Sequence, residues 1–214
     1  MSSCQVSVRH TLVSLNRIFA IFCVVGTHGQ FIEDELIASE PGRPLDRTRP
    51  PLGRNALAFF LVGRETPERK LIYETFQQDG DVVMVEKATV KESAQHMIRS
   101  KFCIQTDGNA PWSPRLMQYV LTGCVPVVVS NKLLPPFHKT LNWSTFSLRV
   151  PVADIARLKN ILTTADHAAL FENLQLAKQL LNYNLQGRTE KSQVSMLNIL
   201  IFEMWQSVQQ QYES

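Results

Sequence analysis

The sequence has few of the residues that build metal sites or disulfide scaffolds. Among its 214 residues are four cysteines and five histidines. No two cysteines form a Cys-x-x-Cys pair, and His96, His138 and His167 have no spacing typical of metal ligands. We therefore expect no metal site. Four cysteines are also too few to hold a chain of this length together without a hydrophobic core.

Three further sequence features are missing. No cluster of lysine and arginine interleaves with aromatic residues, so we expect no nucleic-acid binding. No glycine-rich loop of the Gly-x-Gly-x-x-Gly or Walker type occurs, which argues against a dinucleotide-binding fingerprint. No apolar run reaches the roughly 20 residues that span a bilayer comfortably. The net charge of +3 is too small to indicate a class of partner.

The first 28 residues combine a basic flank with a short apolar run. Arg9 and Arg17 precede the apolar residues Ile18–Val25, and Gly26 follows them. That order is typical of a secretory signal peptide or a weak signal-anchor, in which case this segment would contact a membrane. Two alternatives remain open, namely a core strand or helix and an unrelated leader sequence.

Composition divides the rest of the chain into three parts. Residues 29–54 are rich in proline and charge and are predicted to form a linker, so that the N-terminal segment as a whole is poorly ordered. Residues 55–189 are predicted to form one domain, and residues 190–214 a C-terminal helix. With 44% hydrophobic residues, the chain has enough apolar material for an ordinary core.

Short apolar runs alternate with segments of helical spacing throughout the predicted domain. This alternation is typical of an α/β fold in which helices cover both faces of a parallel sheet. We therefore predict a single Rossmann-like domain followed by a long C-terminal helix. The expected strands are 55–62, 81–85, 101–105, 124–130 and 145–150, and the expected helices are 67–78, 89–100, 113–122, 153–163, 166–183 and 190–212.

Cys103 and Cys124 each lie at the start of a predicted strand. Free cysteine is among the most buried residue types, so two buried thiols are the first interpretation. A disulfide between them requires that their two strands lie close together in space, and the sequence does not decide that.

The last predicted helix is apolar nearly all round. A helix of this kind suits burial between two domains. Where nothing covers it, we expect a partner chain, aggregation or membrane association, because a large exposed apolar patch is unusual. Its apolar positions are Val194, Leu197, Ile199, Leu200, Ile201, Phe202, Met204, Trp205 and Val208.

The loop that follows the third predicted strand has the strongest chemical signal. Asp107 and Gly108 are turn formers. Ser113 suits the N-cap of the next helix, and Pro114 suits its first position. Arg115 lies in the first turn, where its positive charge is unfavourable beside the positive end of the helix dipole. A bound anion would offset that cost, and the free N–H groups at the helix start would also attract the anion. Ser113 and Arg115 therefore predict an anion site, while a plain cap and an Arg115–carboxylate pair explain the same residues.

Asn142-Trp143-Ser144 is an N-glycosylation sequon. Its use requires that the chain reaches a lumenal compartment and that the triplet lies in a surface loop. The sequence shows the triplet but neither of the two conditions.

Several ordered sequence blocks fall within and around Arg99–Val150. They are Arg99-Ser100-Lys101-Phe102-Cys103, Ser113-Pro114-Arg115-Leu116, Gly123-Cys124-Val125-Pro126-Val127, Leu134-Pro135-Pro136-Phe137, Leu141-Asn142-Trp143-Ser144 and Phe146-Ser147, with Phe59-Phe60, Gly63 and Arg69 upstream and Asp154-Ile155 and Leu158-Lys159-Asn160-Ile161-Leu162 downstream. In this order and spacing the blocks resemble the C-terminal signature of the exostosin-like glycosyltransferases, of GT47 type. The resemblance covers about residues 55–185 and is more specific than any single motif.

The resemblance implies a two-domain GT-B architecture, of which this chain contains the C-terminal, nucleotide-sugar-binding domain. It implies transfer of a sugar from a nucleotide sugar, often a UDP-sugar, to a glycan or glycoprotein acceptor in the Golgi membrane or the secretory pathway lumen. Helix N-termini and basic residues hold the diphosphate in that architecture, without a metal or another cofactor. The implied donor-binding residues are Gly63, Arg64, Arg69, Asp107, Gly108, Ser113, Pro114, Arg115 and Gln118.

Two departures from the family pattern matter. The family usually has an acidic residue three positions after the signature arginine, where this chain has the uncharged Gln118. Only 54 residues precede Asn55, and we expect these to be too few for a second, acceptor-binding α/β domain. The predicted function is therefore that of a glycosyltransferase donor half. The alternative is a truncated or inactive domain that acts as an interaction or structural partner.

Overall fold

A computed structural model describes four segments of the chain, residues 53–63, 66–108, 113–181 and 196–212. The predicted signal or anchor and nearly all of the predicted linker lie outside the described residues, and so does Arg64. Within the described residues the fold is α/β with a parallel sheet, which confirms the sequence prediction.

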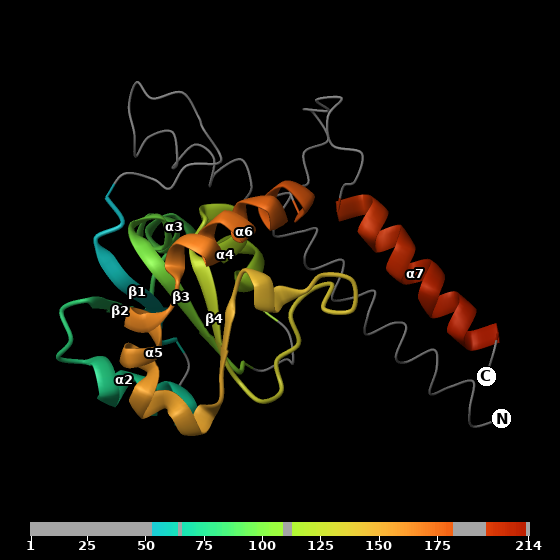
Figure 1. Ribbon diagram of the computed structural model, residues 1–214. Helices are drawn as coiled ribbons and strands as arrows, with labels where there is room; N and C mark the ends of the chain where they lie inside the picture. Colours follow the sequence, from blue (N-terminus) through green and yellow to red (C-terminus); the bar gives the residue numbers. More distant parts are fainter. Residues whose placement is uncertain (1–52, 64–65, 109–112, 182–195, 213–214) are drawn as a thin grey trace.

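Five parallel strands form the central sheet (Figure 1). They run in the order β2-β1-β3-β4-β5, and every neighbouring pair is parallel. Strands β1, β3 and β4 are almost wholly buried, which explains why their sequences are apolar runs without alternation. The bounds are β1 Ala56–Leu61, β2 Val82–Val85, β3 Ser100–Thr106, β4 Val125–Val129 and β5 Leu148–Val150.

Helices cover both faces of the sheet. In Figure 1, α3, α4 and α6 lie along one face, and α2 and α5 lie on the other. The bounds are α2 Pro67–Phe76, α3 Val90–Arg99, α4 Arg115–Thr122, α5 Leu158–Thr164, α6 His167–Leu181 and α7 Met196–Tyr212, with the 3-10 helices η1 Trp143–Thr145 and η2 Val152–Arg157 on either side of β5.

The predicted strand 145–150 and the predicted helix 153–163 lose the largest share of their expected length. The predicted strand 145–150 keeps only its second half, because Asn142 caps a 3-10 turn before it, with Oδ1 accepting the N–H of Ser144 at 3.3 Å. The predicted helix 153–163 begins as η2, since α5 has no side-chain cap and the tighter turn supplies hydrogen bonds at its start. For the predicted helix 190–212, the part before Met196 lies outside the described residues.

Local residues set the ends of two helices. Thr89 and Glu92 form a capping box: the Glu92 N–H donates to Thr89 Oγ1 at 3.2 Å, and the Thr89 N–H donates to Glu92 Oε2 at 2.8 Å. Gly123 ends α4 in the left-handed conformation, with φ 69°, which costs a residue with a Cβ roughly 1–2 kcal/mol. Both ends are therefore set by neighbours in the sequence.

Arg54 ties the C-terminal ends of α3 and α4 together. Its Nη1 donates to Met97 O at 3.1 Å, and its Nη2 donates to Thr122 O at 2.8 Å. A cation is favourable there, because the last carbonyls of a helix lack intrahelical partners and carry the negative end of its dipole. Burial lowers the pKa of Arg54 to about 10.

Cys103 and Cys124 form a disulfide, with their Cα atoms 5.7 Å apart and both side chains fully buried. The first interpretation, two free thiols, is therefore wrong. Strands β3 and β4 are direct neighbours, and Cys103 lies opposite Pro126. Cys124 is only two residues before Pro126, so the two cysteines come close to each other. Which strands are adjacent depends on the order of strands in the sheet, and the sequence of either strand alone does not determine that order.

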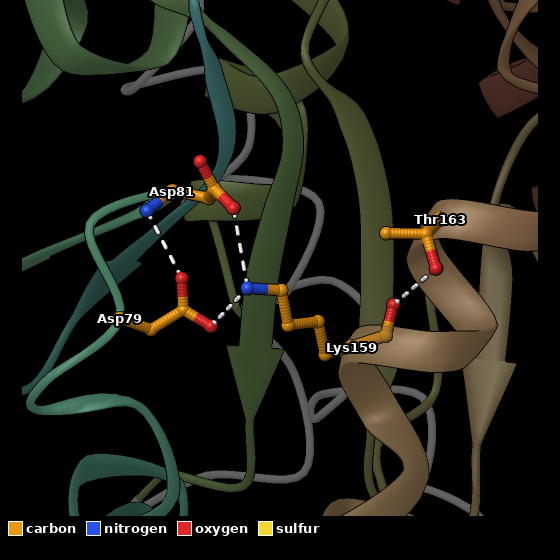
Figure 2. A network of polar contacts seen from close by, with 4 residues as sticks. All are labelled: Asp79, Asp81, Lys159 and Thr163. Carbon is orange, nitrogen blue, oxygen red and sulfur yellow. Dashed lines mark hydrogen bonds and ion pairs between the residues drawn. The ribbon is translucent and has the colours of Figure 1, made fainter.

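A surface ion cluster fastens α5 to the turn before β2 (Figure 2). Lys159 Nζ lies 2.6 Å from Asp79 Oδ2 and 3.2 Å from Asp81 Oδ2. Asp79 Oδ1 also accepts the Asp81 N–H at 3.0 Å. The hydrogen bond from Lys159 lowers the pKa of Asp79, and the same bond raises the pKa of Lys159.

We expect this cluster to make stability depend on pH at both ends of the range. The pKa of Asp79 lies below its ordinary 3.8, so its contribution is present above pH 3.8 and is lost as pH falls through the lowered pKa. The pKa of Lys159 lies above its ordinary 10.5, so its contribution is present below pH 10.5 and is lost as pH rises through the raised pKa. Lys159→Met should lower the melting temperature at neutral pH. It should also make the melting temperature depend less on pH at both the acidic and the alkaline end, as measured by circular dichroism.

Lys70→Met is the matched control for this prediction. Lys70 pairs with Glu74 on α2 at 3.9 Å, and both side chains are exposed, so its removal should change little. Equal effects of Lys159→Met and Lys70→Met on the melting temperature would contradict the prediction.

Helix α7 carries much of the apolar surface that the sequence predicts. Ile199 and Leu200 are buried, and Glu203 Oε1 accepts a hydrogen bond from Thr140 at 2.8 Å. No helix in the described segments, α7 included, has the length and hydropathy needed to cross a membrane. The exposed large apolar side chains of α7 are Ile201, Phe202, Met204, Trp205 and Val208.

Candidate anion site at the sheet edge

The strand order places a topological switch point between β1 and β3. From β1 the chain passes through α2 to β2 on one side, and from β3 it passes through α4 to β4 on the other side. The segments that follow β1 and β3 therefore diverge at the carboxyl edge of the sheet, where ligands bind in open α/β folds. The donor-binding residues implied by the sequence follow these two strands.

Arg69, in the first turn of α2, reaches back over the end of β1. Its Nη1 donates to Leu61 O at 3.3 Å and also to Val62 O. Gly63 permits this close approach, because it has φ 56° and a Cβ there would lie 3.0 Å from Arg69 Nη1. Arg69 is 8% exposed, and its Nε has no hydrogen-bond partner among the described residues. Gly63 and Arg69 thus form one unit at the end of β1.

Arg115 begins α4, one turn before Tyr119. The Tyr119 phenol is fully buried and donates to Ile104 O on β3 at 3.1 Å, and it lies near the Arg115 guanidinium. Burial raises the pKa of Tyr119 to about 12, although the charges of Arg115 and Arg69 act in the opposite direction. Tyr119 therefore stays neutral at physiological pH and anchors the helix that begins with Arg115 to β3.

The guanidinium groups of Arg69 and Arg115 lie close enough for their charges to interact. Burial lowers the pKa of Arg69, and the charge of Arg115 lowers it further. In the described part of the chain neither arginine forms an ion pair with a carboxylate. The alternative interpretation, in which Arg115 pairs with a carboxylate, therefore has no support among these residues. Two like charges held together in this way favour an anion beside them.

The start of α4 differs in detail from the prediction. The helix begins at Arg115, and Pro114 occupies the N-cap position. Ser113 caps from one residue earlier, since its Oγ accepts the Arg115 N–H and its carbonyl accepts the Leu116 N–H, both at 3.3 Å. The Met117 N–H bonds to Pro114 O at 3.1 Å. The first three N–H groups therefore have acceptors already, and an anion here would depend on the guanidinium groups and the helix dipole.

A buried amide supports Ser113 from the sheet. Gln105, on β3, is 2% exposed; its Oε1 accepts the Ser113 hydroxyl at 3.2 Å, and its Nε2 donates to Thr106 O at 2.7 Å. Both the proton and the oxygen of the Ser113 hydroxyl are thus engaged within the protein. The connected bonds hold the start of α4 against β3.

Asp107 and Gly108 follow β3 at the same edge. The Asp107 carboxylate accepts the hydroxyl proton of Ser130, which follows β4. The Ser130 oxygen in turn accepts the N–H groups of Lys132 and Leu133, at 2.9 and 2.7 Å. Asp107 therefore fastens the loop after β4, while Gly108 is exposed, with open space where a Cβ would lie.

Gln118 is partly exposed on α4, three residues after Arg115. That spacing keeps it on the same side of the helix as Arg115. Across the described segments, no group of three or more His, Cys, Asp and Glu side chains could hold a metal ion.

Two residues of this site are not predicted from the sequence. Tyr119 follows Arg115 by four positions, and Gln105 is a polar residue within an apolar strand. Helical spacing is a signal for the first, and a polar side chain that must be satisfied in a buried strand is a signal for the second. Neither signal identifies the residue to which the side chain bonds, because that residue depends on how α4 packs against β3.

Comparison with known proteins finds clear relatives. The family model described as the Exostosin GT47 domain matches residues 35–165, more than half of the chain. A probable glycosyltransferase of Arabidopsis thaliana is 39% identical over 116 residues, which are 53% of this chain and 22% of that protein. A probable glucuronosyltransferase of Physcomitrium patens is 34% identical over 110 residues, 50% of this chain and 24% of that protein. A probable glucuronoxylan glucuronosyltransferase of Arabidopsis thaliana is 37% identical over 94 residues, 42% of this chain and 20% of that protein.

The chain thus spans about a fifth to a quarter of the length of these relatives. The family match includes all five strands of the sheet and both arginines of the candidate site. The resemblance carried by the sequence blocks is therefore confirmed, and the chain belongs to the exostosin GT47 family.

Proposed function

We propose that this domain binds the diphosphate of a nucleotide sugar, in the first instance a UDP-sugar, as the donor half of a glycosyltransferase. The supporting observation is the pair Arg69 and Arg115 at the switch point, without an acidic partner among the described residues. The Leu61 and Val62 carbonyls accept hydrogen bonds from Arg69 and hold it in place, and Arg115 begins the helix that Tyr119 anchors to β3. Preorganised groups lose little freedom when they bind an anion.

The proposed chemistry follows from the charge on the leaving group. In sugar transfer, the bond between the anomeric carbon and the diphosphate oxygen breaks, and a hydroxyl of a glycan or glycoprotein acceptor forms the new bond as it loses its proton. Negative charge grows on the diphosphate during this step, so cations placed there stabilise the transition state more than the ground state. We assign that role to Arg69 and Arg115, and the proposal includes no metal or other cofactor.

We further propose that the chain works in the Golgi membrane or the secretory pathway lumen. The buried Cys103–Cys124 disulfide supports this, because disulfides form and persist in oxidising compartments. The signal-like pattern before Gly26 is consistent with the same route.

Calorimetric titration of the full chain with UDP tests the donor proposal. We expect UDP to bind more tightly than uridine, because only UDP supplies the anion, and we expect its affinity to fall as salt rises. Inorganic diphosphate should compete with UDP for the same site. No binding of UDP at low salt, or equal affinities for UDP and uridine, would contradict the proposal.

The exposed face of α7 favours a second candidate function, that of an interaction or structural partner. Gln118, in place of the family's acidic residue, favours it as well. A transferase assay with UDP-sugars separates the two candidates, since hydrolysis or transfer above background excludes a purely structural role.

A further inference from the structure

We propose that Asn142 carries an N-linked oligosaccharide. Asn142, Trp143 and Ser144 form the one Asn-x-Ser/Thr triplet in the 214-residue sequence. The triplet lies in the connection between β4 and β5, at the start of η1. It shares no residue with the Arg69–Arg115 site, so this inference does not depend on the proposed donor function.

The fold leaves the two chemically required side chains of the triplet accessible. Asn142 and Ser144 are exposed, whereas Trp143 between them is 6% exposed and donates from Nε1 to Pro136 O at 2.7 Å. Trp143 thus anchors the segment in the core while its two neighbours face solvent. An oligosaccharide on Asn142 would displace no core side chain, so the modified chain can adopt the same fold.

The hydrogen bonds of Asn142 leave its amide nitrogen available. Its Oδ1 accepts the Ser144 hydroxyl at 2.7 Å and the Ser144 N–H at 3.3 Å. Its Nδ2, the atom to which a sugar would be joined, donates to no other described residue. The short bond between Oδ1 and the Ser144 hydroxyl pairs the two groups that define the sequon.

The donor for this modification is a lipid-linked oligosaccharyl diphosphate. A new bond joins Asn142 Nδ2 to the anomeric carbon of the first sugar, and the bond from that carbon to the diphosphate oxygen breaks. Nδ2 loses one proton, and the lipid diphosphate leaves with the electron pair. The step takes place in the lumen of the secretory pathway, and the buried Cys103–Cys124 disulfide is an independent sign that this chain folds in such an oxidising compartment.

The triplet lies away from the proposed donor site. Because β5 runs parallel to β4, the residues of η1 just before β5 lie toward the amino edge of the sheet, opposite Arg69 and Arg115. Thr145, at the end of η1, is held there by Asn173 of α6, whose Nδ2 donates to its carbonyl at 3.0 Å. We therefore expect UDP affinity to be the same with and without the oligosaccharide.

Production of the full chain in eukaryotic cells, followed by peptide N-glycosidase treatment and mass measurement, tests the proposal. We expect the enzyme to remove one oligosaccharide and to convert Asn142 to aspartate. Asn142→Gln and Ser144→Ala should each abolish the modification, while Ser144→Thr, which retains the hydroxyl, should preserve it. Asn160→Gln, on an exposed position of α5 outside any sequon, is the matched control and should leave the modification intact.

A C-terminal tag with its own Asn-Gly-Thr sequence shows whether the chain has entered the lumen. If the tag is modified and Asn142 is not, the triplet is not used and the proposal is overturned. If neither is modified, the chain does not enter the lumen, and the proposal is overturned as well. UDP binding is measured separately, so failure of the donor proposal leaves this result unaffected.

Discussion

Replacing Arg115 with alanine is expected to weaken UDP binding by about ten- to a hundredfold, because a hydrogen bond to a charged group contributes roughly 1.5–3 kcal/mol. Arg115 begins the helix that Tyr119 anchors to β3 and pairs with no carboxylate of the described residues, so the substitution removes a cation that no protein anion neutralises among them. The side chain is only partly buried, and the fold should change little. Calorimetric titration with UDP measures the loss, and thermal unfolding checks the fold.

Two further variants show whether the effect belongs to this site. Arg115→Lys keeps the charge but lacks the planar fork that grips two oxygens, so we expect an affinity between those of the native chain and Arg115→Ala. Arg99→Ala removes an exposed cation where α3 runs into β3, at the opposite edge of the sheet, and should leave UDP affinity unchanged. If Arg99→Ala weakens binding as much as Arg115→Ala does, the attraction is a general surface effect and the Arg69–Arg115 site is refuted.

Replacing Cys103 and Cys124 together with alanine is expected to lower the free energy of unfolding by about 3 kcal/mol. The disulfide joins residues that are 21 positions apart, and the unfolded chain without it regains the conformational freedom that the closed loop removes. The closed loop contains the whole of α4, so the variant should also loosen the helix that carries Arg115. Urea unfolding monitored by circular dichroism measures the change.

A reducing agent supplies the internal comparison for the disulfide. It should destabilise the native chain by a similar amount and leave the double alanine variant unchanged. Cys4→Ala combined with Cys23→Ala is the matched control, because neither residue takes part in the Cys103–Cys124 bond. If the reducing agent still destabilises the Cys103/Cys124 variant, another bond is responsible for the effect.

Features that depend on neighbours in the chain could be predicted from the sequence. The capping box of Thr89 and Glu92 and the left-handed Gly123 depend only on nearby residues, and the strands lie where apolar runs occur. Prediction of secondary structure from the sequence is less reliable where a short segment can adopt either of two backbone conformations. The 3-10 turn capped by Asn142 replaces the first half of a predicted strand, because side-chain capping there competes with extended backbone.

Features that depend on two elements meeting could not be predicted in the same way. The sequence predicts that Ser113 caps α4, and it does so from one residue earlier, but its bond to Gln105 requires α4 to pack on β3. The same packing brings Tyr119 to Ile104 O and so places the helix that begins with Arg115. None of these partners follows from helical or strand spacing alone.

Residue order and local spacing are enough to predict the α/β alternation, the family resemblance and the location of Ser113 and Arg115 after the third strand. Only the folded chain brings Cys103 to Cys124 and Arg69 near Arg115. These contacts depend on which strands are neighbours in the sheet and on how the helices pack against it. The energy of that arrangement comes from the buried core as a whole and not from any one segment.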